Sequence, residues 1–327
     1  MNERFSQIPE LFPEPARTAI RRLLEEKEDR VEELRLRVGG AISWVTRGRE
    51  IYLDESLPPV EPTLLEGLLR RASGHGVYAV EDQLRQGYLT LPGGCRMGLC
   101  GSAALEGGRI RTLRELQAVN LRLAREHPGC ADAVSSCLWA NPGSTLILGP
   151  PGAGKTTILR DLVRQISDRF SRRVGLVDER GELAACRGGR PQLNVGRRTD
   201  VLTGCPKAEG IELLLRAMAP EWIAVDEITG AADVEAVTRA SYCGVRFLAT
   251  AHASEPGDLC RRPVYRSLLD SGVFENLALI RPDRSLKWER MNHERVEAGG
   301  ERADPGELFL GGAAGRGPSA ERQTGPA

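Results

Sequence analysis

GPPGAGKT, residues 149–156, matches the phosphate-loop pattern GxxxxGK[ST] and has the sequence context that this pattern requires. An apolar strand over residues 145–148 precedes it, and a helix-compatible run over residues 157–167 follows it. Glycines let backbone N–H groups converge on phosphate oxygens, and the start of a helix adds partial positive charge. Lys155 would reach the β- and γ-phosphates. We therefore expect a site for ATP and Mg²⁺ that contains Gly149, Pro150, Pro151, Gly152, Ala153, Gly154, Lys155, Thr156 and Thr157, with the Thr156 hydroxyl on the metal.

A second apolar strand, residues 222–225, ends in two adjacent carboxylates, Asp226 and Glu227. Ligands of parallel sheets bind at the carboxyl ends of the strands, so this strand end is expected beside the phosphate loop. Asp226 would then hold Mg²⁺, directly or through water. Glu227, one residue further, would orient the attacking water and act as the general base.

A third apolar strand, residues 174–177, ends in Asp178-Glu-Arg-Gly-Glu182. If this strand lies between the phosphate-loop strand and the Asp226 strand, the core belongs to the additional-strand branch of P-loop ATPases. Glu179 and Glu182 are candidates for a further acidic group near Mg²⁺ or water. A charged start of a loop is the alternative interpretation.

The strand over residues 247–250 continues into Ala251-His252-Ala253, which puts Thr250 and His252 at another carboxyl end. There His252 could contact the γ-phosphate and report its loss, whereas a lone histidine is more often structural.

Four arginines lie within twelve residues that contain no acid, and they could complete the nucleotide site of a neighbouring subunit. A solvated loop in an arginine-rich protein is the alternative. The four are Arg187, Arg190, Arg197 and Arg198, and Arg197 and Arg198 are our candidates for the catalytic role.

Composition divides the chain into three segments. Residues 1–128 mix helix-like and alternating strand-like runs, which predicts a small α+β domain. Residues 129–290 alternate short apolar strands with helices, which predicts a parallel sheet with helices on both faces. Residues 291–327 are rich in Gly, Ala and Pro and have few large apolar groups, so we expect a mobile tail.

The charges balance, with 45 basic and 45 acidic side chains, so no global electrostatic case for nucleic acid exists. No apolar run is long enough for a transmembrane helix, and residues 1–10 have no apolar core of a secretory signal. We expect a cytoplasmic protein. Its eight cysteines form no CxxC pair, so neither a zinc site nor a disulfide framework is indicated.

Several runs outside the phosphate loop resemble a known family. Residues 5–290 are similar to the stage III sporulation protein AA family, ATPases of endospore-forming bacteria that look like the type II and type IV secretion ATPases. The runs that carry the resemblance are residues 81–101, Val177-Asp-Glu-Arg180, Val195-Gly-Arg-Arg-Thr-Asp-Val201, Cys205-Pro-Lys-Ala-Glu-Gly210 and Val225-Asp-Glu-Ile228.

The resemblance implies ATP hydrolysis by a ring, an N-terminal domain folded over the nucleotide site, and action at the mother-cell face of a channel to the forespore. By position, Lys155 and Thr156 fall on the Walker A loop, and Asp226 and Glu227 on Walker B. Glu179 or Glu182 falls near the acidic box of the secretion ATPases, and His252 on their histidine box.

The combined prediction is an α/β protein: a RecA-like additional-strand P-loop ATPase core with a smaller N-terminal α+β domain. We expect a homo-oligomer, and a hexamer in particular. It should act peripherally at a membrane, with membrane-anchored sporulation channel proteins as partners. We expect no stable nucleic-acid partner. Two alternatives stay open. RecA-like cores also drive nucleic-acid motors, and a chain of this kind could be an ATP-binding assembly scaffold without productive turnover.

Overall fold

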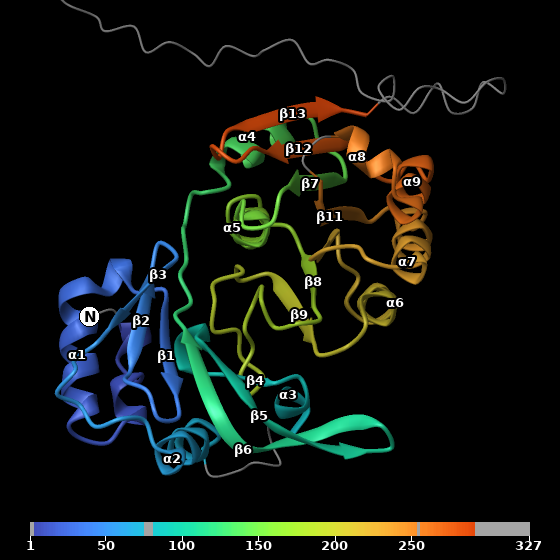
Figure 1. Cartoon of the computed structure of the whole chain (residues 1–327). Helices are drawn as coiled ribbons and strands as arrows, with labels where there is room; N and C mark the ends of the chain where they lie inside the picture. The colour runs from blue at the N-terminus through green and yellow to red at the C-terminus, as the bar shows by residue number, and fades with distance from the viewer. Residues whose placement is uncertain (1–2, 75–80, 254–255, 292–327) are drawn as a thin grey trace, which may run out of the picture. The chain divides into compact units, whose positions relative to one another are not determined.

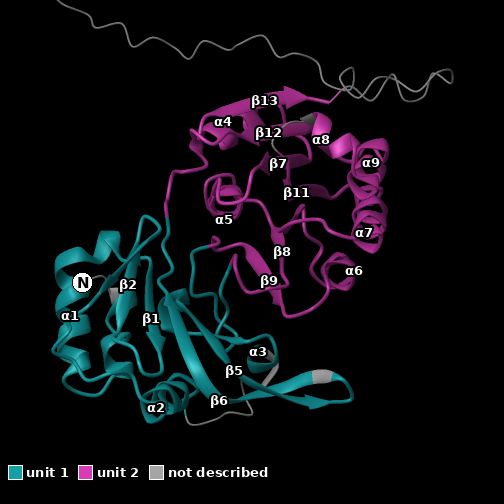
Figure 2. Cartoon of the chain, in the orientation of Figure 1, with its two compact units in different colours: residues 1–126, 184–194 teal, residues 127–183, 195–327 magenta. Residues whose placement is uncertain are grey.

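The computed structural model describes residues 3–74, 81–253 and 256–291. The chain forms two compact units (Figure 2). The first comprises Met1–Glu126 with Ala184–Asn194, and the second comprises His127–Leu183 with Val195–Ala327. The predicted domain limits at residues 128 and 290 stay predictions. The predicted tail, apart from Met291, lies outside the described residues.

The first unit contains an antiparallel sheet in the order β3-β2-β1-β6-β5-β4 (Figure 1). Its period-two pattern follows from the sequence: Leu34 and Leu36 are fully buried, whereas the charged residues between and beside them are not. The strands in the described part of this unit are β1 (Glu33–Arg37), β2 (Ser43–Thr46), β3 (Arg49–Tyr52), β4 (Tyr88–Thr90), β5 (Arg96–Glu106) and β6 (Arg109–Arg122).

Helices complete the core of the first unit. Pro62 begins α2, where its missing N–H has no cost, and the apolar stripe of this helix buries Leu65 and Leu68. The predicted α+β architecture is therefore confirmed. The described helices are α1 (Ala16–Lys27), α2 (Pro62–Ala72) and α3 (Glu81–Arg85), with short 3-10 turns at Glu3–Phe5, Pro9–Leu11, Glu28–Arg30 and Pro92–Gly94.

Residues 184–194 join the first unit although they follow a strand of the second in sequence. The Arg187 guanidinium donates a hydrogen bond to the Ala72 carbonyl at 3.1 Å. Gly94 has φ +81°, and a Cβ on it would lie 2.9 Å from Leu193. A close approach of backbone and side chain therefore requires glycine at this turn.

The second unit is built on a sheet in the order β13-β12-β7-β11-β10-β8-β9. All neighbours are parallel except the antiparallel pair of β12 and β13. Sequence analysis missed β9 and β13. The described strands of this unit are β7 (Thr145–Gly149), β8 (Val174–Asp178), β9 (Thr199–Thr203), β10 (Trp222–Val225), β11 (Arg246–His252), β12 (Asn276–Ile280) and β13 (Leu286–Arg290).

The sequence left open whether the strand over residues 174–177 lies between the phosphate-loop strand and the Asp226 strand, and it does not. The strand between the phosphate-loop strand β7 and the Asp226 strand β10 is β11, and β8 lies on the far side of β10. The additional strand exists, but it comes from later in the chain. Strand order depends on contacts between distant segments, and the local pattern of residues 174–177 carries no information about them.

Helices cover both faces of this sheet, as predicted (Figure 1). Leu146 and Leu148 of β7 belong to one core cluster with side chains of α6, α7 and α9, whereas Ile147 between them does not. Helix α5 contacts β7, β8 and β11. The described helices are α4 (Asp132–Ala140), α5 (Lys155–Asp168), α6 (Lys207–Met218), α7 (Ala231–Ser241), α8 (Pro256–Cys260) and α9 (Pro263–Asp270).

We predict that Gly210→Ala destabilises the protein. An exposed helix would gain up to about 1 kcal/mol from this change. Here, however, a Cβ would lie 2.6 Å from a methyl of Val177 and 3.0 Å from the sulfur of Cys205. We expect overpacking to cost about 1–3 kcal/mol and to lower the melting midpoint. The control is Gly257→Ala in α8, where a Cβ meets nothing within 4 Å. Equal midpoints for the two variants would contradict the account.

Candidate nucleotide site

The phosphate loop joins β7 to α5, as the sequence predicts. Gly152 has φ +77° and Gly154 has φ +88°, and a Cβ at either position would meet nothing within 4 Å. Both conformations disfavour other residues. The loop thus leaves open space beside its glycines at the N-terminus of α5, where the helix carries partial positive charge.

Lys155 is the first residue of α5, and it is buried. Its ammonium group donates hydrogen bonds to the carbonyl oxygens of Gly149 and Pro150, each at 2.9 Å. A third contact, also 2.9 Å, joins it to Nδ1 of His252. Burial lowers the pKa of Lys155, and the nearby carboxylates of Asp226 and Glu227 oppose this shift.

The sheet register explains the contact with His252. His252 ends β11 and is paired with Gly149 at the end of β7. An ammonium group can only donate, so Nδ1 must accept, which puts the proton of the neutral imidazole on Nε2. Nε2 lies 3.6 Å from a carboxylate oxygen of Glu227. His252 therefore stands between the loop lysine and the predicted general base.

A second chain of hydrogen bonds joins α5, β10 and β11. Thr156 donates from its hydroxyl to one oxygen of Asp226 at 2.9 Å, and Thr250 donates to the other at 2.6 Å. The Thr250 oxygen also accepts the backbone N–H of Glu227 at 2.9 Å. Thr250 thus fixes both acids, and sequence analysis placed it at the strand end without giving it a role.

Glu227 adopts a left-handed backbone conformation with φ +38°. This region is unfavourable for a residue with a side chain and typically costs on the order of 1–3 kcal/mol. Such outliers cluster at functional sites. Together with the hydrogen bond from its N–H to Thr250, this conformation holds the carboxylate next to His252.

These side chains fit Mg²⁺ and a nucleotide. Mg²⁺ prefers oxygen ligands and usually takes one or two protein groups besides phosphate and water. Thr156 and Asp226 offer a hydroxyl and a carboxylate within hydrogen-bonding distance of each other. The open loop beside Gly152 and Gly154 has room for phosphate oxygens.

The third acidic strand end does not present free carboxylates to this site. Glu179 forms an ion pair with Lys207, whose side chain is buried. Asp178 is buried and accepts hydrogen bonds from the backbone N–H groups of Glu182 and Leu183. The Glu182 side chain is exposed, and its carbonyl accepts a hydrogen bond from Arg160. Sequence analysis missed the partner Lys207, although its rarity as one of four lysines was a signal.

The candidate trans arginines lie away from this chain's own phosphate loop. The backbone N–H of Arg197 bonds to Asp168, and that of Arg198 bonds to Ser167, both at the C-terminal end of α5. This helix has 14 residues. At 1.5 Å per residue, the end of the helix that Arg197 and Arg198 contact is therefore roughly 20 Å from Lys155, at its start. Both residues are exposed, and the Arg198 guanidinium also donates a hydrogen bond to the Ser167 carbonyl at 3.5 Å.

A parallel sheet with a glycine loop, a loop lysine and an adjacent acidic strand end defines the class: a RecA-like P-loop ATPase fold. The match to the family model described as "Sporulation stage III, protein AA" covers residues 4–286. The chain belongs to this family, as the sequence indicated. It is 37% identical over 275 residues to stage III sporulation protein AA of Bacillus subtilis, covering 83% of this chain and 89% of that protein.

Solved structures support the fold. The ATPase DotB of Legionella pneumophila is 19% identical, with a TM-score of 0.55 over 89% of this chain and 85% of DotB. The pilus retraction motor PilT, solved with bound ADP, is 15% identical, with a TM-score of 0.57 over 82% of this chain and 80% of PilT. At these identities the likeness establishes the fold alone.

We predict that Thr250→Val lowers both the stability of the protein and its Mg²⁺-dependent binding of ATP, although the two side chains have nearly the same shape. Valine keeps the volume but removes the donor to Asp226 and the acceptor for Glu227, at a cost of about 1–3 kcal/mol. The melting midpoint should fall, and Mg²⁺-dependent binding of ATP should weaken. The control is Thr145→Val, another buried threonine of the same sheet, whose hydroxyl donates to the Gly143 carbonyl. Unchanged Mg²⁺ dependence in Thr250→Val would contradict the assignment.

Proposed function

We propose that this chain hydrolyses ATP with Mg²⁺, and that a hexameric ring of it powers or gates a secretion-like channel at a membrane during sporulation. The observation that carries the proposal is the contact of Lys155 with His252, which in turn faces Glu227. Lys155 and His252 thereby connect the phosphate loop to Glu227, the predicted general base. The family supports the link to sporulation, and relatives of the fold are named as an ATPase and a pilus retraction motor.

Each residue has a distinct part in the proposed reaction. Lys155 binds phosphate oxygens and gives up its contacts with loop carbonyls and His252. Thr156 and Asp226 would hold Mg²⁺, which would supply positive charge to the phosphates. Glu227 orients the attacking water and accepts its proton. His252, released when Lys155 moves to phosphate, changes its position toward Glu227 and reports whether the γ-phosphate is present.

Glu179 and Glu182 have a secondary part in this proposal. Because Glu179 is paired with Lys207, it acts as a base only if that ion pair opens. We assign Glu227 the primary role and retain Glu179 and Glu182 as acids that contribute in another conformation.

Work at a membrane requires docking. Among the described residues, none of the helices has the length and apolarity to cross a bilayer. We propose that residues 1–128 form the docking or gating domain, that residues 129–290 form the motor, and that the partner is a membrane-anchored channel protein on the mother-cell side. The protein is then cytoplasmic and peripherally bound.

The first functional prediction separates binding from chemistry. Lys155→Ala should abolish ATP binding, because the lysine contacts ground-state phosphates. Glu227→Gln should retain binding and lower turnover about a hundredfold or more, because the base is lost. Equilibrium binding of a fluorescent ATP analogue and phosphate release by the full chain measure the two effects. Lys27→Ala, which removes a lysine near Trp44 in the other unit, is the control.

The outcomes discriminate between candidate bases. Parental turnover in Glu227→Gln would transfer the role of base to Glu179 or Glu182. Tight binding without turnover in the unmodified protein, at any protein concentration, would favour the scaffold.

The second functional prediction concerns assembly. Arg197→Ala or Arg198→Ala should reduce turnover, by up to about a thousandfold if the residue is a trans arginine. Mixing the inactive variant with Lys155→Ala should restore turnover, because mixed interfaces join an intact loop to an intact arginine. The exposed Arg216→Ala in α6 is the control. Failure of both variants to rescue would exclude these two residues from the trans role.

A further inference from the structure

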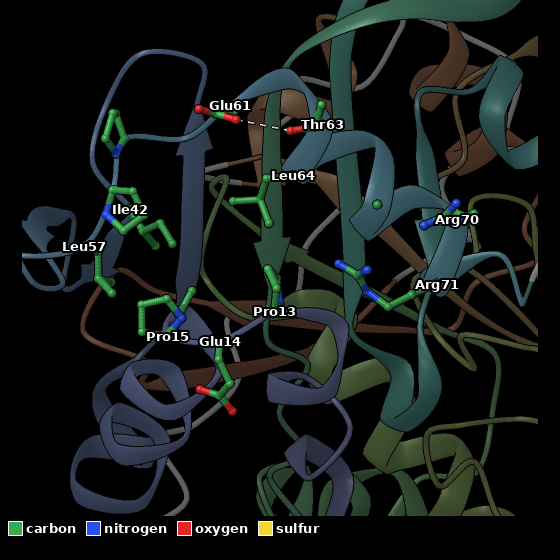
Figure 3. A pocket seen from close by; sticks show the side chains of 14 residues that line it. Pro13, Glu14, Pro15, Ile42, Leu57, Glu61, Thr63, Leu64, Arg70 and Arg71 are labelled. Carbon is green, nitrogen blue, oxygen red and sulfur yellow. Dashed lines mark hydrogen bonds between the residues drawn. The ribbon is translucent and has the colours of Figure 1, made fainter.

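The first unit contains a cavity of about 380 Å³ between the segment that leads into α1, the 57–59 loop and helix α2 (Figure 3). Four prolines line it together with apolar side chains that include Ile42 and Leu64. Prolines have fixed φ and no N–H donor. The walls of the cavity are therefore stiff and apolar. Such walls suit an inserted apolar side chain and lower the entropy that is lost on binding. The prolines are Pro13, Pro15, Pro58 and Pro59.

Arg71 gives this cavity a fixed polar end. Its Nε donates a hydrogen bond to the Leu11 carbonyl at 2.5 Å, which leaves the two terminal nitrogens of the guanidinium. The group lies over Gly67 of the same helix, where a Cβ would be 3.2 Å from a terminal nitrogen. Figure 3 shows Arg71 extending from α2 toward Pro13. Glycine thus makes room for a guanidinium that is held in one orientation.

Among the described contacts, no ion pair joins the two carboxylates that line the cavity to its two guanidinium groups, Arg70 and Arg71. Glu14 already accepts hydrogen bonds from Thr18, and Glu61 accepts one from Thr63. In the part of the chain that the structure describes, neither Arg70 nor Arg71 forms an ion pair. Burial lowers the pKa of Arg71, and the charges of Arg70 and Arg17 lower it further. An anion beside Arg71 would relieve this repulsion.

We propose that this cavity binds an extended segment of another protein in which an apolar side chain is followed by a carboxylate. The apolar side chain enters between the prolines and Leu64, and the carboxylate accepts two hydrogen bonds from the terminal nitrogens of Arg71, the planar pairing that arginine favours. The inference goes beyond the proposed ATPase and does not rest on it, because binding is measured without nucleotide.

The test uses end-blocked, fluorescein-labelled hexapeptides in which Leu, Ile, Phe or Trp is followed by Asp or Glu, and the full chain as receptor. We expect acidic peptides to bind by fluorescence anisotropy. Their Asn or Gln counterparts should bind about tenfold more weakly or worse, because a charge-assisted pair is lost.

Two variants separate recognition from folding. Arg71→Gln should lose at least about tenfold in affinity for the acidic peptide. Gly67→Ala should displace the guanidinium and weaken binding, while the melting midpoint is kept or raised because alanine is the better helix former. Gly257→Ala in α8 and Arg22→Gln on the exposed face of α1 are controls that should bind as the parent does.

Three outcomes would overturn the proposal. One is that no acidic peptide binds, and another is that Arg71→Gln and Gly67→Ala bind as well as the parent. The third is that the chain ending at residue 291 binds the peptides more than tenfold more tightly than the full chain, since the occupant would then be this chain's own C-terminal segment.

Discussion

The contacts of one buried ammonium group, that of Lys155, determine how the site in the second unit is arranged. Lys155 is tied to the carbonyls of Gly149 and Pro150 and to His252, and burial lowers its pKa. A cation in such a place needs either these acceptors or a stronger anion. The same contacts that stabilise the free loop are therefore the ones that a phosphate would replace, and the rest of the site is arranged around that exchange.

Sheet topology brings the partners of this lysine together. Because β11 lies between β7 and β10, its terminal residues reach both sides: His252 contacts Lys155, and Thr250 contacts Asp226. The acids of β10 are thus coupled to the phosphate loop through one intervening strand. The left-handed conformation of Glu227 stores strain at the same junction. A change at Lys155 can then be transmitted to Glu227 over a few hydrogen bonds.

Local patterns predicted the loop, the apolar strands and the α/β class, because each depends on a short run of residues. Contacts between distant segments were not predictable. The sequence does not reveal that β11 rather than β8 lies between β7 and β10, that Lys207 pairs with Glu179, or that residues 184–194 pack with the first unit. The strand β9, Thr199–Thr203, was missed because its residues are half-buried or exposed and lack an apolar run. The polar contacts of the site likewise join residues that are far apart in the sequence, such as Lys155 with His252 and Thr156 with Asp226.

The central claim is that Lys155 exchanges its protein acceptors for phosphate. With only four lysines in the chain, ¹⁵N-labelled lysine gives few side-chain signals, and Lys155→Ala assigns the relevant one. Titration by NMR should show a pKa for Lys155 below the ordinary lysine range in the free protein. Saturating Mg²⁺ and a non-hydrolysable ATP analogue should raise it, because phosphate charge favours the ammonium form, while Lys27 stays unchanged. A Lys155 signal and pKa that do not respond to the saturating nucleotide would contradict the account.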